Sequence, residues 1–236
     1  MGNPVRAVLS VALGGLIVVF LLFTGLGLLI KNYLGALSRW DNDVNTWLVE
    51  HRTSRLNDWT HTATGVADTL GILVVLVLAI VVLLLVRRRW AALFLGLALA
   101  LELISFLSVN FVVDRPRPDV VRLGTLPSTS SFPSGHTAAV VALYGGLALI
   151  LSDRFRFWVV QFIVWLVAVL ATAAIGYGRV YRGMHHPSDA IAGVLLGIAV
   201  LCVASFAVRA GQLAIDKRND SPENGKQQSL FSEVVR

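Results

Sequence analysis

Charged residues are scarce in this chain of 236 residues. Asp, Glu, Lys and Arg make up 14% of it and hydrophobic residues 56%, whereas a soluble domain has roughly 25% charged and 45–50% apolar residues. This balance excludes an ordinary soluble domain and predicts a protein embedded in a lipid bilayer. The net charge of +6 does not indicate a nucleic-acid partner, because the sequence has no basic block with interleaved aromatic residues.

Cysteine is almost absent as well. The single cysteine, Cys202, excludes an internal disulfide and a metal site made of cysteine thiolates. Cys202 lies within an apolar run, and we expect it to pack as a small hydrophobic side chain.

Long apolar runs are the main feature of the sequence. Six of them predict membrane-spanning helices at about residues 8–30, 66–86, 90–113, 136–151, 157–177 and 189–208. The first run is too long for the apolar core of a signal peptide, and no small-residue cleavage site follows it, so we interpret it as a membrane helix. We therefore expect an all-α, polytopic membrane protein with one domain over residues 1–208.

Residues 31–65 differ from the apolar runs. Their apolar members recur at steps of three and four, which is typical of an amphipathic helix, and Trp40, Trp47 and Trp59 suit the interface between membrane and water. We expect this segment on the outer surface of the membrane, either as a plain connection or as a lid that admits lipids. Residues 209–236 are polar and predict a cytoplasmic tail with a disordered end.

Basic residues indicate the orientation of the spans. Six spans place both termini on one side, together with Arg6, Arg87, Arg88, Arg89, Arg154, Arg156, Arg209, Lys217 and Arg218. The positive-inside rule assigns that side to the cytoplasm, so we expect a multi-pass protein of the plasma or inner membrane with cytoplasmic termini. The outer loops also carry arginines, Arg115, Arg117 and Arg122 in one and Arg179 and Arg182 in the other. This excess on the outer side indicates an anionic ligand there.

The turn before the fourth span has features of an anion site. In Pro133-Ser134-Gly135-His136, Ser134 is a suitable N-cap for a helix whose first backbone N–H groups have no internal partner. Those groups and the helix dipole attract anions, Gly135 allows a close approach, and His136 supplies a proton donor. A simple cap of a membrane helix is the alternative interpretation of these residues alone.

Together the turn and the outer loops carry the groups that phosphoryl transfer requires. A guanidinium group can bind two phosphate oxygens at once through two parallel hydrogen bonds. Fixed backbone amides stabilise the negative charge that develops on the phosphate oxygens during the reaction. A neutral imidazole can attack phosphorus when a carboxylate fixes its orientation, and a second imidazole can protonate the leaving oxygen.

Three sequence blocks resemble the type 2 phosphatidic acid phosphatase (PAP2) superfamily, whose integral-membrane members are lipid phosphatases. The family's blocks are Lys, six residues, then Arg-Pro; Pro-Ser-Gly-His; and Ser-Arg, five residues, His, three residues, Asp. Arg117-Pro118 matches the end of the first block and Pro133–His136 matches the second in full. Arg179, His185 and Asp189 fall at the spacing of the third.

The resemblance implies a role for each matched residue. His185 is the expected nucleophile, which forms a phosphohistidine, Asp189 orients it, and His136 is the general acid. The expected phosphate ligands follow the same blocks and are Arg117, Arg179, Ser134 and Gly135, with Arg115 and Arg182 as secondary candidates.

Two positions depart from the family pattern. Asn110 stands where the family has its lysine, and Gly178 where it has serine. Asn110 can still donate a hydrogen bond to phosphate, although a charge-assisted bond is roughly twice as strong as a neutral one. We therefore count Asn110 among the phosphate ligands and expect either lower activity or compensation by Arg115, Arg122 or Arg182.

The resemblance implies metal-independent hydrolysis of a lipid phosphate or diphosphate that arrives from the outer leaflet of the bilayer. Arginines and amides replace the positive field of a metal, so we expect no metal and no other cofactor. Undecaprenyl diphosphate or another polyprenyl diphosphate is the favoured substrate, with phosphatidylglycerophosphate, phosphatidic acid and sphingoid phosphates as alternatives. Phosphotransfer to another lipid and a non-catalytic lipid or anion transporter are alternative functions.

Overall fold

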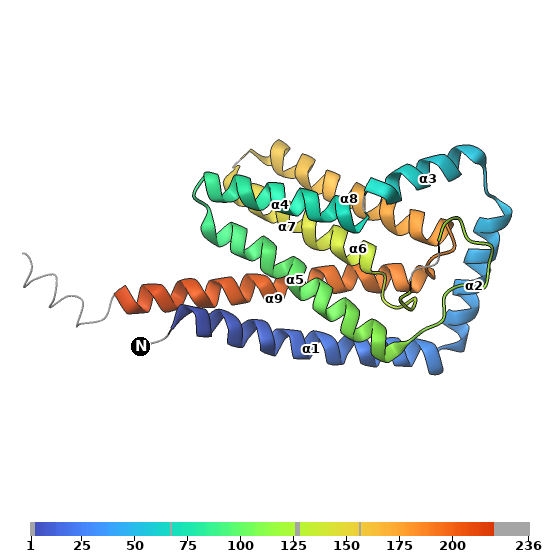
Figure 1. The fold of residues 1–236 in the computed structure, drawn as a ribbon, viewed down its shortest axis with the longest axis horizontal. Helices are drawn as coiled ribbons and strands as arrows, with labels where there is room; N and C mark the ends of the chain where they lie inside the picture. The colour runs from blue at the N-terminus through green and yellow to red at the C-terminus, as the bar shows by residue number, and fades with distance from the viewer. Residues whose placement is uncertain (1–2, 67, 126–127, 156, 220–236) are drawn as a thin grey trace, which may run out of the picture.

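The computed structural model describes residues 3–66, 68–125, 128–155 and 157–219, and within these ranges the chain is helical without a strand (Figure 1). The elements in chain order are α1 (Pro4–Asn32), α2 (Gly35–Glu50), α3 (Ser54–Val66), α4 (Thr69–Leu85), α5 (Arg89–Val113), α6 (Gly135–Val140), the π-helical turn η1 (Val141–Gly145), α7 (Gly146–Arg154), α8 (Trp158–Tyr181) and α9 (Pro187–Asn219).

Five helical stretches are long and apolar enough to cross a membrane. They are α1, α5, α8, α9 and the stretch Gly135–Arg154, which α6, η1 and α7 form together. The pair α3 and α4 makes a sixth candidate, with a bend of 46° between the two helices. Helices satisfy their own backbone hydrogen bonds, which is what a bilayer requires of a spanning segment. The predicted all-α, polytopic membrane fold is confirmed.

The last helix is longer than predicted. α9 continues to Asn219, past the expected end of the sixth span at residue 208, so the polar tail begins as helix. This extension packs on the rest of the bundle, since a Cβ at Gly211 would lie 2.6 Å from Val8 Cγ2 of α1. Arg156 and residues 220–236, for which we also made predictions, lie outside the described residues.

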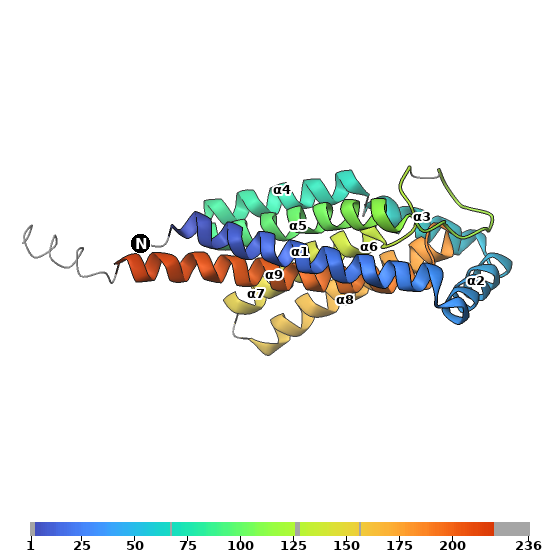
Figure 2. The same ribbon diagram turned by 90° about the horizontal axis from the view of Figure 1, so that it is seen from below.

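Three helices, α1, α5 and α9, lie side by side in both views and form the main core (Figures 1 and 2). Small residues bring them close together, because a Cβ at Gly15 of α1 would lie 2.4 Å from Val203 Cγ1 of α9. Leu95 and Ala98 of α5 are completely buried in this core. Cys202 is exposed on α9, so the expectation that it packs inside the protein was wrong.

The start of α6 rests directly on the backbone of α9. A Cβ at Gly193 would lie 2.5 Å from Ser134 O, and one at Gly197 would lie 2.5 Å from Val141 Cβ. Only glycine allows this approach. The contact fixes the turn before α6 against the first turns of α9, where Asp189 lies.

Residues 31–65 form two helices rather than the single amphipathic helix we predicted. Figure 1 shows α2 lying across the end of the bundle, with α3 leading away from it to α4. The buried residues of α2 are Asp41, Asn45 and Leu48, so two of the three are polar. The tryptophans of this segment are exposed. The sequence pattern thus indicated a helix but not its polar inner face.

Candidate active site

The predicted site residues come together at the end of the bundle that α2 covers. Figure 1 shows the loop 114–132, the start of α6 and the segment between α8 and α9 at this end, opposite to the N-terminus and to the end of α9. Backbone hydrogen bonds join the three segments, with Ser134 N donating to Asp189 O and Leu123 N donating to Arg182 O, each at 3.0 Å.

His185 lies in the short segment before α9 and is 2% exposed. Its Nδ1 is 2.7 Å from Ser131 O, and because a carbonyl oxygen only accepts, Nδ1 carries the proton. The other nitrogen, Nε2, then holds a lone pair and lies 3.5 Å from Nη1 of Arg117. Burial, with the nearby Arg179 and Arg117, holds the pKa of His185 well below its ordinary value, so the imidazole is neutral at neutral pH.

Asp189 does not bind His185 directly, contrary to the expected orienting contact. The Asp189 carboxylate lies 4.0 Å from His185 Nδ1, beyond hydrogen-bond distance. It accepts from Ser131 Oγ and, at 2.9 Å, from His186 N, and its other oxygen accepts from Arg115 at 2.5 Å. Asp189 therefore positions Ser131, whose carbonyl in turn orients the imidazole of His185.

Arg115 is committed to protein partners, which corrects its assignment as a secondary phosphate ligand. Its Nη1 donates to Ser188 Oγ at 2.8 Å and to Asp189 at 2.5 Å, and its Nη2 donates to Asp41 at 2.8 Å. Asp41 also accepts from the amide and the hydroxyl of Ser188. The arginine lies between two buried carboxylates and offsets part of their negative charge.

Arg117 is held by the loop that carries it. Its Nε and Nη2 donate to Thr129 and to Ser130 O, and its Nη1 donates to Met184 O. Nη1 is also the group that lies near His185 Nε2. Burial is the main cause that lowers the pKa of Arg117 from its ordinary value. The guanidinium is therefore held with Nη1 beside His185 Nε2.

Arg179 lies in the last turn of α8 and is 8% exposed. Its Nε has no hydrogen-bond partner among the residues that the structure describes. A buried cation without a partner is costly, and an anion that reached it would remove that cost. The charges of Arg179 and Arg117 both lower the pKa of His185, so the two guanidinium groups act on the same imidazole.

His136 is the second residue of α6 and faces a partner that the sequence did not reveal. Its Nε2 lies 3.1 Å from Oδ1 of Asp68, which precedes the first residue of α4. The positive charge of His136 would also act on His185, so the two imidazoles belong to one site. Asp68 lies within the apolar run predicted at residues 66–86, and an ionisable residue inside such a run was a sequence signal that could have marked it.

The segments that form the site lie within the part of the chain that matches a known family. The family model of the PAP2 superfamily matches residues 90–211, just over half of the chain, and so includes the loop, the turn and the start of α9. The chain belongs to the PAP2 superfamily. The resemblance inferred from the three sequence blocks is confirmed.

Two relatives show what this PAP2 protein is similar to. An undecaprenyl-diphosphatase of Sulfolobus acidocaldarius is 37% identical over 71 residues, which is 30% of each chain. Phosphatidylglycerophosphatase B of Bacillus subtilis is 28% identical over 113 residues, 48% of this chain and 55% of that protein. The matched parts therefore span about a third and about half of the length of these two relatives.

Two crystal structures share the fold. A transmembrane PAP2-type phosphatidylglycerolphosphate phosphatase of Bacillus subtilis gives a TM-score of 0.70 at 23% identity, covering 87% of this chain and 95% of that one. LpxE of Aquifex aeolicus gives a TM-score of 0.55 at 26% identity, covering 69% of this chain and 93% of that one.

Asn110, at the family lysine position, binds the loop rather than the site. Its Nδ2 donates to Ser130 O at 3.0 Å and to Phe132 O at 3.1 Å, and its Oδ1 accepts from Ser130 N at 3.0 Å. Both amide hydrogens are used, so the prediction of Asn110 as a phosphate ligand was wrong. The residue instead holds the loop segment that presents Ser131 O to His185.

Gly178, at the family serine position, allows α3 to pack against α8. A Cβ there would lie 2.9 Å from Thr64 Cγ2 of α3. Gly135 has a similar role, because a Cβ would lie 2.9 Å from the ring of Phe106. We predicted Gly135 as a place where phosphate approaches the backbone, and its lack of a side chain is explained by this ring contact.

Ser134 is the N-cap residue of α6, as the sequence predicted. Its hydroxyl, however, lies 2.9 Å from Thr137 Oγ1, and its amide donates to Asp189 O. The Ser134 amide is therefore not free for a phosphate, and this part of the expected cradle is corrected. The amides of Gly135 and His136 have no acceptor among the described residues.

Two further arginines lie at the edge of the site. Nη1 of Arg182 makes only long contacts with α3, 3.4 Å to Asn57 O and 3.5 Å to Thr60 Oγ1. Arg122 donates to Pro118 O at 2.7 Å, and its Nε has no partner within the described ranges. The structure thus leaves both as candidates for contacts with a headgroup.

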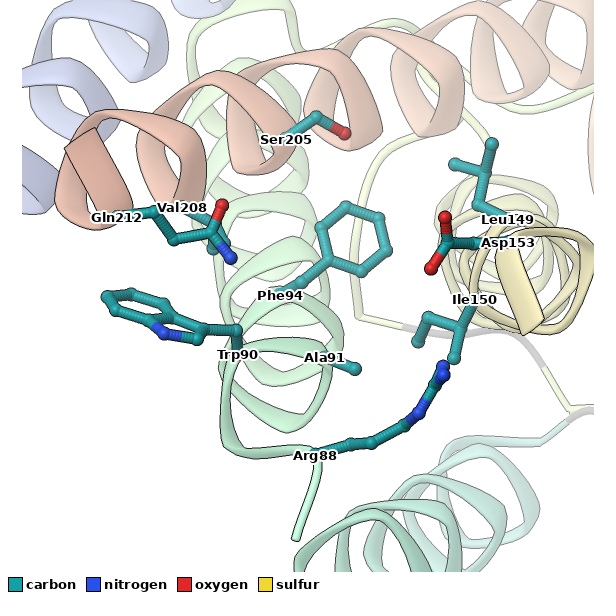
Figure 3. A pocket seen from close by; sticks show the side chains of 10 residues that line it. All are labelled: Arg88, Trp90, Ala91, Phe94, Leu149, Ile150, Asp153, Ser205, Val208 and Gln212. Carbon is teal, nitrogen blue, oxygen red and sulfur yellow. The ribbon is translucent and has the colours of Figure 1, made fainter. Parts of the chain in front are cut away.

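A separate pocket lies at the opposite end of the bundle from these residues. It has a volume of about 240 Å³, lies between the start of α5, the end of α7 and the C-terminal half of α9, and has Arg88 and Asp153 among its lining residues (Figure 3). None of the predicted site residues lines it. Within the described ranges, no group of three or more His, Cys, Asp or Glu side chains could hold a metal ion.

Proposed function

We propose that this protein is a membrane phosphatase that hydrolyses a lipid phosphate or diphosphate at the site around His185. The observation that carries the proposal is the buried Arg179, whose Nε lacks a partner in the described structure and whose charge acts on the neutral His185. A phosphoryl group placed beside Arg179 would give this cation a partner and would lie against the lone pair of His185 Nε2, where the charge of Arg117 also acts on it. The similarity to an undecaprenyl-diphosphatase and to phosphatidylglycerophosphatase B supports the same activity.

In the proposed first step, His185 Nε2 attacks phosphorus and the bond from phosphorus to the leaving oxygen breaks. His136 donates its Nε2 proton to that oxygen, and Arg117 and Arg179 bind the non-bridging oxygens as charge grows on them. In the second step water attacks the phosphohistidine, with His136 taking the proton as base. Inorganic phosphate leaves and His185 returns to its neutral form.

The favoured substrate is undecaprenyl diphosphate or another polyprenyl diphosphate, and phosphatidylglycerophosphate and phosphatidic acid are the alternatives. An apolar groove of about 660 Å³ between α8 and α9 supports a lipid substrate. Trp165 and Val194 line its walls, and it reaches Thr137 and Pro187, which follow His136 and His186 in the chain. A hydrocarbon chain in this groove would keep its phosphate at the mouth of the site.

The proposed orientation places the site on the extracytoplasmic face and both termini in the cytoplasm. The start of α1 and the end of α9 lie at the end of the bundle opposite to α2, and the basic run Arg87–Arg89 lies at that same end (Figure 1). Labelling of single cysteines introduced at Asp119 and at Lys217, in a chain with Cys202 replaced by alanine, tests this orientation. A membrane-impermeant maleimide should label position 119 in intact cells and position 217 only after lysis.

The activity is tested with purified protein and a panel of undecaprenyl diphosphate, phosphatidylglycerophosphate and phosphatidic acid. We expect release of inorganic phosphate without added metal, and loss of release in His185→Ala. Lipid binding without release would favour a non-catalytic transporter, and transfer of the phosphoryl group to a second lipid would favour a phosphotransferase. Retained activity in His185→Ala, or complete inhibition by EDTA, would contradict the mechanism.

A further inference from the structure

Asp68 is the partner of His136, although it belongs to none of the three sequence blocks. It lies between α3 and α4, and its Oδ1 is 3.1 Å from Nε2 of His136 at the start of α6. An ionised carboxylate only accepts hydrogen bonds, so the contact places a proton on Nε2 of the imidazole. Nε2 is the atom from which the proposed acid would donate its proton.

The charges around His136 make this contact important. Burial is the largest influence against a positive charge on the imidazole, Arg179 of α8 and Arg117 of the loop 114–132 add to it, and Asp68 favours the charge. α9 also packs on α6 and carries Asp189, whose oxygens are bound to Arg115, Ser131 and His186. Among the described residues, Asp68 is therefore the carboxylate that can keep His136 charged beside two guanidinium groups.

The side chain of Asp68 is much more exposed to solvent than those of His185 and Arg179. The side chain of Asp68 is 69% exposed and that of His136 is 24% exposed. The Asp68 carboxylate lies where any group that accepts the Nε2 proton must lie. The leaving oxygen of a substrate is such a group, so it must replace Asp68 in order to accept the proton. Because most of the Asp68 side chain is exposed, it can turn away at small cost when the leaving oxygen arrives.

We propose that Asp68 is a positioning residue that keeps His136 protonated at Nε2 in the free enzyme and yields its place to the leaving oxygen of the substrate. The proton moves from His136 Nε2 to that oxygen as its bond to phosphorus breaks, and Asp68 forms no bond to the substrate. This inference rests on the proposed phosphatase function, because it assigns Asp68 to the acid step of that reaction.

The test compares Asp68→Asn with wild type over pH 5 to 9. The alkaline limb of the kcat/KM profile should move to lower pH by about 0.5 to 1 pH unit, less than for a buried charge pair because Asp68 is exposed. At pH 8 this shift corresponds to a loss of about three- to tenfold in kcat/KM, with little loss at pH 5.5. The kcat profile should change less, because it reports the complex in which the leaving oxygen has replaced Asp68.

Three further variants show whether the effect passes through His136. Asp68→Glu should restore most of the wild-type profile, and Asp58→Asn, which changes an exposed aspartate of α3, should leave it unchanged. In a His136→Ala background, Asp68→Asn should cause no additional loss. A loss that is equal at all pH values, or an additional loss without His136, would overturn the proposal in favour of a structural role for Asp68.

A measurement without turnover separates this proposal from the proposed function. In protein labelled with 15N-histidine, the titration midpoint of His136, assigned from the His136→Ala spectrum, should fall in Asp68→Asn. An unchanged midpoint overturns the role of Asp68 even if the wild-type protein releases phosphate. If wild type releases no phosphate from any lipid, the proposed function fails, and the role of Asp68 in the acid step fails with it whatever the midpoint shows.

Discussion

The guanidinium of Arg115 donates to the carboxylate of Asp41 across 2.8 Å, and both side chains are almost completely removed from solvent. Asp41 belongs to α2, which the sequence placed on the membrane surface, and Arg115 also binds Asp189 at the start of α9. The pair therefore ties α2 to the residues that surround His185. Asn45, one helical turn after Asp41, adds a second link by donating to His185 O at 3.2 Å.

Asp41→Asn should destabilise the protein strongly, because it leaves the buried Arg115 with one carboxylate fewer. Breaking a buried ion pair by removing one partner costs about 3–5 kcal/mol. Thermal unfolding in detergent should show a clear fall in Tm, and phosphatase activity should fall as Ser188 and Asp189 lose their support. Asp43→Asn, an exposed neighbour on the same helix, is the matched control, and equal Tm values for the two variants would refute this role of Asp41.

Arg117→Gln should move the acid limb of the pH–rate profile to higher pH. Burial comes first among the causes that lower the pKa of His185, followed by the charges of Arg179 and Arg117. Removing one positive charge lets His185 accept a proton more readily, and a protonated imidazole cannot attack phosphorus. We expect a shift of about 1 pH unit in kcat/KM together with a loss of about 10²-fold or more at the optimum.

Arg117→Lys separates the charge from the geometry in this experiment. It should lower activity, because an ammonium cannot reproduce the contacts of the guanidinium, while leaving the acid limb close to its wild-type position. Arg55→Gln, an exposed change on α3, should alter neither quantity. An acid limb that stays in place in Arg117→Gln would mean that this charge does not act on the nucleophile.

Asn110→Lys, which restores the residue of the family pattern, should lower activity rather than raise it. The substitution removes the three hydrogen bonds to Ser130 and Phe132 and leaves Ser130 N and Phe132 O without their side-chain partner. Each unsatisfied group costs about 1–3 kcal/mol, and the loop that orients His185 should loosen. Phosphate release and Tm report the two effects, with Asn32→Lys as an exposed control. A gain in activity would show that a lysine at this position reaches the phosphate.

Gly193→Ala should disturb the site from the opposite side of α6. The added Cβ would lie 2.5 Å from Ser134 O, so α6 must move away from α9. Overpacking of this kind costs about 1–3 kcal/mol, and a displacement of about 1 Å at a catalytic group can cost 10²-fold in rate. Gly14→Ala has no atom within 4 Å of its new Cβ and should behave as wild type in Tm and in activity. Equal behaviour of the two variants would contradict the close contact of α6 with α9.

The sequence predicted the helical membrane fold and the family because the information for both is local. An apolar run of sufficient length must form a helix in a bilayer, whatever its neighbours are. The blocks around Arg117, His136 and His185 hold their residues at fixed spacings along the chain, so they were visible without a structure. The same local view could not show that α2 turns a polar face inward, because its apolar spacing indicated a surface helix.

Tertiary structure decided which of the marked residues are free to act. Arg115 and Arg179 look alike in the sequence, yet the first is bound to Asp41 and Asp189 while Nε of the second has no partner in the part of the chain that the structure describes. Asp68 meets His136 only because α4 returns to α6, 68 positions further along the chain. The sequence by itself determined the membrane helices and the reactive groups, since these depend on local spacing and hydrophobicity. Which groups are neutralised, oriented or left unpaired depends on contacts between segments that are distant along the chain, and only the folded structure supplies them.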